Sequence, residues 1–87
     1  MKVRRRPAAD VLERDGETAV LVDGRIVRLS ELSSLLYAEC STEKTSVQLS
    51  RSLETAFGAP RELPALEATE RAIEEMLAHG VLELVED

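Results

Sequence analysis

The sequence predicts an α+β fold of the winged helix-turn-helix type, in which a three-stranded antiparallel meander is followed by three helices. Two observations predict it: the first half alternates β-forming segments with Gly-containing turns, and the second half carries apolar residues at helical spacing. With 87 residues, 44% of them hydrophobic and 32% charged, the chain has the composition of one small globular domain. We assign residues 1–10 to a basic flexible tail and residues 11–87 to this domain.

The predicted strands are defined by their turns. Residues 18–22 are rich in β-formers, and Asp23 and Gly24 follow them. An Asp-Gly pair tolerates the two positive φ angles of a type I′ turn, so residues 18–22 and 25–29 are expected to pair. The segment that starts at Val11 supplies the first strand, with a turn at Gly16 and Glu17. The three strands form a meander whose first and third strands are both edges.

Helix signals begin directly after the third strand. Ser30 is a suitable N-cap for a first helix of about ten residues, whose apolar positions are Leu32, Leu35, Leu36 and Cys40.

The second helix is expected to start at Thr45, because Gln48 three residues later completes a capping box. Gly58 ends this helix. Its apolar positions are Leu49, Leu53, Ala56 and Phe57.

Pro64 suits the first turn of a third helix, which ends at His79 and Gly80. The buried stripe expected on it comprises Leu66, Ile73, Met76 and Leu77. Residues 81–85 are apolar and β-prone, and the sequence leaves open whether they form a strand or pack on the core.

Charge is unevenly distributed along the chain. Lys2, Arg4, Arg5 and Arg6 precede the first acidic residue, and the rest of the chain holds seven basic and seventeen acidic residues, a net charge of −10. A body this acidic repels phosphate backbones, which argues against nucleic acid as the main ligand. Cys40 is the only cysteine, so an intrachain disulfide is impossible, and no apolar run is long enough for a signal peptide or a membrane span. We therefore expect a cytoplasmic protein without membrane contact.

Catalytic constellations are scarce. His79 is the only histidine and stands at a helix end, where the helix dipole favours it, and Cys40 stands at an apolar helical position typical of a small buried hydrophobe. Glu67, Glu70 and Glu74 are most simply a solvated helix face, since no Asp-rich loop or His pair adds metal ligands. We expect no enzymatic activity, no metal and no cofactor.

The third strand is the less protected edge of the meander, because the first carries Glu13, Arg14 and Asp15. In the register that we prefer, Val27 and Leu29 face the core, while Ile26 and Arg28 face outward. An extended peptide could pair with this edge and place side chains against the third helix. Coverage of the edge by residues 81–85 or by a second copy of the protein is an equally weighted alternative.

The run from Val20 to Ser30, with its Asp23-Gly24 turn, and the leucine-bearing helix that follows resemble the PqqD-like peptide chaperones, also called RiPP recognition elements. The Thr45 helix and the stretch from Ala78 to Leu82, with Gly80 in it, match the later parts of the family pattern. Ser30 stands where the family commonly has asparagine, and both residues cap helices. The resemblance extends from Val11 to Leu82.

This resemblance implies a non-catalytic adaptor that binds the leader of a ribosomal precursor peptide as an added strand and delivers it to a maturation enzyme of the radical SAM or ATP-dependent class. Arg28 and Arg71 are suited to acidic leader residues, with ordinary surface charge as the alternative. The implied contacts on the third strand and on the third helix are Arg25, Ile26, Val27, Arg28, Leu29, Thr69, Arg71, Ala72, Ile73 and Met76.

Two other functions remain open at this point, and the sequence leaves the oligomeric state open as well. A winged-helix DNA-binding transcriptional regulator is the main alternative, although the third helix carries Glu67, Glu70, Glu74 and Glu75 against Arg71. A subunit with a purely structural role is the other.

Overall fold

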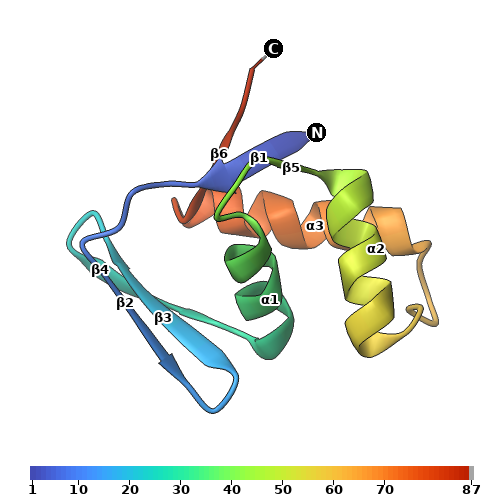
Figure 1. Cartoon of the computed structure of the whole chain (residues 1–87), viewed down its shortest axis with the longest axis horizontal. Helices are drawn as coiled ribbons and strands as arrows, with labels where there is room; N and C mark the ends of the chain where they lie inside the picture. The colour runs from blue at the N-terminus through green and yellow to red at the C-terminus, as the bar shows by residue number, and fades with distance from the viewer. Residues whose placement is uncertain (87) are drawn as a thin grey trace.

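The computed structural model describes residues 1–86, and Asp87, the last residue of the expected domain, lies outside them. Two small antiparallel sheets and three helices make up the fold (Figure 1). The predicted α+β class, with a three-stranded meander followed by three helices, is confirmed. The meander comprises β2 (Asp10–Arg14), β3 (Glu17–Val22) and β4 (Arg25–Leu29), and the helices are α1 (Glu31–Glu39), α2 (Ser46–Phe57) and α3 (Ala65–Ala78).

Both turns of the meander are two-residue Asp-Gly turns with positive φ angles. Asp23 and Gly24 have φ angles of 51° and 72°, in agreement with the predicted turn. The turn expected at Gly16 and Glu17 lies one residue earlier, because Asp15 and Gly16 adopt φ angles of 52° and 80°. Glu17 consequently belongs to β3, where it pairs with Arg14.

In place of the flexible tail expected for residues 1–10, the chain begins with a strand, β1 (Lys2–Arg5), and continues into β2 at Asp10. β1 is the middle strand of the second sheet, between β5 (Lys44–Thr45) and β6 (Leu82–Leu84). Val3 is fully buried at its centre. The prediction rested on basic charge alone, and it missed partners that come from distant parts of the chain. The sequence left open whether residues 81–85 form a strand, and the structure shows that they contain one, β6, which pairs with β1.

The basic side chains at the start of the chain have partners within the fold. Arg4 forms an ion pair with Glu83 at 2.9 Å. The Arg5 guanidinium lies 4.3 Å from the centre of the Tyr37 ring and donates a hydrogen bond to the Tyr37 carbonyl oxygen at 2.7 Å. Arg6 contacts Asp23 and donates to the Gly80 carbonyl oxygen, both at 3.0 Å. These contacts connect the start of the chain to β6, to α1, to the turn between β3 and β4, and to the residues that follow α3.

Local capping explains where the first two helices begin. The Ser30 hydroxyl accepts a hydrogen bond from the Ser33 amide at 3.1 Å, which confirms the predicted N-cap of α1. Thr45 and Gln48 exchange both bonds of the capping box at the start of α2. Gly58, with φ of 82°, ends α2 as expected.

The core lies between the helices and the inner faces of the two sheets. Several apolar positions predicted to be buried are exposed instead, namely Leu32, Ala56, Phe57 and Leu66. Tyr37 and Thr69 are buried in addition to the predicted residues. The buried hydrophobic cluster is Val3, Val20, Val22, Val27, Leu29, Leu36, Tyr37, Cys40, Leu49, Leu53, Ile73, Met76, Val81 and Leu82.

Candidate functional site

β4 is an edge strand of the meander. The strand order is β2-β3-β4, so β4 pairs with β3 on one side and with no other strand of residues 1–86. The last strand, β6, pairs with β1 in the other sheet and not with β4 (Figure 1). Of the alternatives that the sequence left open, coverage of this edge by residues 81–85 is therefore excluded.

The sheet register shows which backbone groups of β4 point outward. Leu21 in β3 is opposite Ile26, and its carbonyl oxygen accepts a hydrogen bond from Ala9 on the far side, at 2.9 Å. In an antiparallel pair, successive residues direct their backbone groups alternately toward and away from the partner strand. The amide and carbonyl groups of Ile26 and Arg28 therefore point away from β3, whereas those of Val27 point toward it.

The side chains of β4 follow the register that we preferred from the sequence. Val27 and Leu29 are buried in the core, whereas Ile26 is 70% exposed and Arg28 is exposed. The buried pair holds the strand in place while its outer edge stays accessible.

The residues expected on α3 have two different environments. Thr69, Ile73 and Met76 are each at most 2% exposed and belong to the interior. Ala72 is half-buried, and Arg71 is exposed and forms an ion pair with Glu67 at 3.5 Å. Of the five helix residues, therefore, only these two offer appreciable surface to a ligand.

β4 and α3 are joined at one end. Arg25, at the start of β4, donates a hydrogen bond from Nη2 to the carbonyl oxygen of His79 at the end of α3, at 3.1 Å. This contact brings the first residue of the predicted strand site next to the end of the predicted helix site.

Beyond the other end of β4 lies an apolar cavity that the sequence did not indicate. It has a volume of about 190 Å³ and lies between the start of α1, the end of α2 and the first half of α3. Leu32, three residues after β4, lines it together with Ala65 and Ala68. The one sequence feature that agrees with this cavity is the pair of small residues Ala65 and Ala68 on α3. Helical periodicity predicted Leu32 to be buried in the core and so gave no indication that it borders a cavity.

The groups that could carry chemistry have ordinary structural surroundings. Cys40 is fully buried, and burial raises the pKa of its thiol to about 11. His79 is exposed, with Nε2 3.9 Å from a Glu75 carboxylate oxygen. Within residues 1–86, no group of three or more histidine, cysteine or acidic side chains is placed to hold a metal ion. None of the helices in the same range is long and apolar enough to cross a membrane.

Comparison of the chain with protein-family models, with curated proteins and with solved structures found no match.

Proposed function

We propose that this protein is a non-catalytic adaptor, which binds the leader of a ribosomal precursor peptide by strand addition to β4 and delivers it to a modifying enzyme. The observation that carries the proposal is the outer edge of β4, which has no strand partner among the described residues. Recognition of an extended peptide requires such an edge, because main-chain hydrogen bonds supply much of the affinity.

Strand addition would use the outward backbone groups of Ile26 and Arg28. Each residue offers one donor and one acceptor, and each hydrogen bond contributes about 0.5–1.5 kcal/mol net. A peptide that extends past Leu29 would reach Leu32 and could place an apolar side chain in the neighbouring 190 Å³ cavity. Burial of such a side chain contributes about 1.5–3 kcal/mol, from which the cost of ordering the peptide is subtracted.

The arginines differ in their availability to a bound leader. Arg25 is engaged with the His79 carbonyl oxygen, and Arg71 is paired with Glu67. Arg28 is exposed and forms no ion pair with any residue of 1–86. We therefore assign to Arg28 the recognition of an acidic leader residue near the centre of the added strand.

A DNA-binding regulator is less well supported. α3, the helix that would enter the groove, exposes Glu67, Glu74 and Glu75. The basic residues at the start of the chain, which could have served as an arm on phosphates, contact acidic side chains, carbonyl oxygens and Tyr37 within the fold. Both features reduce attraction to a phosphate backbone.

The test is a proline scan of β4 read out by titration with labelled leader peptides encoded beside this gene. Ile26→Pro and Arg28→Pro each remove one outward amide while leaving the bonds to β3 in place. We expect each to weaken leader binding by about threefold to tenfold, whereas Ile26→Ala, which keeps the amide, weakens it less.

Circular dichroism of each variant checks that the fold is retained. Unchanged leader affinity in both proline variants would contradict strand addition at β4. Salt-sensitive binding of random duplex DNA, with no saturable binding of any leader, would favour the regulator instead.

A further inference from the structure

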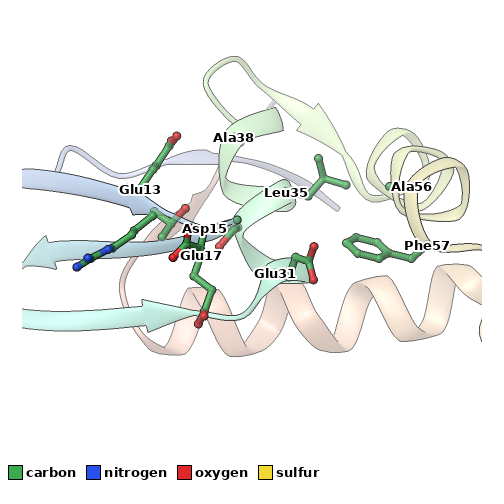
Figure 2. A pocket seen from close by; sticks show the side chains of 12 residues that line it. Glu13, Asp15, Glu17, Glu31, Leu35, Ala38, Ala56 and Phe57 are labelled. Atoms are coloured by element: carbon green, nitrogen blue, oxygen red, sulfur yellow. The ribbon is translucent and has the colours of Figure 1, made fainter.

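A second and larger cleft is lined by residues outside β4. It lies between the β2–β3 turn, α1 and the end of α2, has a volume of about 580 Å³, and includes no residue of β4 or α3 (Figure 2). Four carboxylates stand around it, from Glu13, Asp15, Glu17 and Glu31. We call this feature the acidic cleft.

The negative charge of the acidic cleft is not neutralised within the fold. None of its four carboxylates forms an ion pair with a residue of 1–86, and Arg14 is the one basic residue among those that line it. The tight turn at Gly16 lies close to Glu31, since a β-carbon built on Gly16 would be 3.8 Å from Glu31 Cγ. The carboxylates around the cleft give it a negative potential, which favours a positively charged ligand.

The inner wall of the acidic cleft is apolar. Leu35 and Ala38 of α1 and Ala56 and Phe57 of α2 line it, and Figure 2 shows the Phe57 ring directed from α2 toward α1. Phe57 is the chain's one phenylalanine, and 48% of it is exposed. Together these four residues offer a wall on which apolar side chains of a ligand could pack.

We propose that the acidic cleft binds a segment of a partner protein in which arginine or lysine residues flank apolar side chains. The carboxylates would pair with the basic residues, while the apolar residues would pack on Leu35 and Phe57. This site goes beyond the proposed leader site, because Phe57 alone among its lining residues also borders the 190 Å³ cavity and none of them belongs to β4 or α3.

Charge identifies the occupant among the other classes of ligand. Nucleic acid would be repelled by the four carboxylates. A second copy of this chain is a poor match, since its basic stretch at Arg4, Arg5 and Arg6 is already engaged within its own fold. A basic and apolar segment of a different protein satisfies both parts of the cleft.

The probe for this proposal is a short capped peptide in which arginine alternates with leucine. Titrated into the isotope-labelled protein, it should shift the amide resonances of residues 13–18 and those around Glu31 and Phe57. A peptide with glutamate in place of arginine should cause no shift there, and one with alanine in place of leucine should bind at least severalfold more weakly.

Variants of the cleft separate specific docking from general attraction to an acidic protein. The triple variant Glu13→Gln, Glu17→Gln, Glu31→Gln should weaken the arginine–leucine peptide by about tenfold, given the modest energy of each exposed ion pair. Ala38→Arg, which adds a positive charge at an exposed helix position inside the cleft, should weaken it as well. The control Glu62→Gln, Glu74→Gln, Glu86→Gln removes the same charge from exposed positions outside the cleft and should leave the affinity unchanged.

Equal losses in the two triple variants would overturn the proposal, and so would resonance shifts centred on Ile26 and Arg28. Phe57 also borders the 190 Å³ cavity near β4, so a substitution at Phe57 could affect both sites. The charge variants change only the acidic cleft and therefore distinguish it from the leader site. If the cleft variants lose the arginine–leucine peptide but still bind the leader, the leader site and the acidic cleft are two separate binding sites.

Discussion

Arg25 donates a hydrogen bond to the His79 carbonyl oxygen at 3.1 Å and so connects residues that lie 54 positions apart. The bond holds the start of the edge strand β4 against the end of α3. We expect Arg25→Met to lower the free energy of unfolding by about 0.5–1 kcal/mol, because the bond is charge-assisted but exposed.

Urea denaturation measures this change. Arg28→Met, which removes the same charge from the same strand, is the control, since the Arg28 side chain forms no hydrogen bond or ion pair with any residue of 1–86. Equal effects of the two substitutions would mean that the contact with His79 contributes nothing to stability.

Val3 tests whether the start of the chain is part of the fold. It is fully buried in the middle strand of the second sheet, so Val3→Ala should lower the free energy of unfolding by about 2 kcal/mol. The same substitution at Val11, which is 37% exposed on β2, should change it by less than about 0.5 kcal/mol. A flexible tail would instead make Val3→Ala the milder of the two in thermal or urea denaturation.

The capping box at α2 gives a third prediction. The Thr45 hydroxyl accepts a hydrogen bond from the backbone amide of Gln48 at 3.2 Å, and the side-chain oxygen of Gln48 accepts one from the backbone amide of Thr45 at 2.9 Å. Thr45→Ala should therefore destabilise the protein by about 1 kcal/mol in urea denaturation. Thr55→Ala, within the same helix, should cause no loss, since its hydroxyl bonds only to the Arg51 carbonyl oxygen and alanine is the better helix former. A loss at Thr55 as large as that at Thr45 would contradict the role of the cap.

Cys40 makes stability depend on pH in the alkaline range. Burial raises the pKa of its thiol from 9.0 to about 11, so the unfolded chain loses the thiol proton at a lower pH than the folded chain does. Between pH 9 and 11 the unfolded state therefore binds fewer protons, and the free energy of unfolding falls as the pH rises.

Cys40→Ala should remove this part of the pH dependence. Urea denaturation at several pH values from 7 to 10.5 gives the slope for each protein. The residual slope in the variant would include Tyr37, whose pKa is also raised by burial. Identical slopes in the two proteins would show that the thiol ionises equally well when folded.

Some parts of the candidate site could be predicted from the sequence, and others could not. The inward direction of Val27 and Leu29 followed from strand alternation and the Asp23-Gly24 turn. The roles of Thr69 and Leu32 were not predictable, because helical periodicity does not specify which side of an apolar stripe meets the core and which borders a cavity.

The sequence by itself determined the local features: the turn at Asp23 and Gly24, the caps at Ser30 and Thr45, the end of α2 at Gly58, and with them the order of the three meander strands and the three helices. These depend on backbone sterics and hydrogen bonds within a few residues. Only the tertiary structure decided that β1 pairs with β5 and β6, that β4 has no second strand beside it, and that the acidic turn and Phe57 line the same cleft. Pairing between distant segments depends on how the whole core packs, and no short stretch of sequence contains that information.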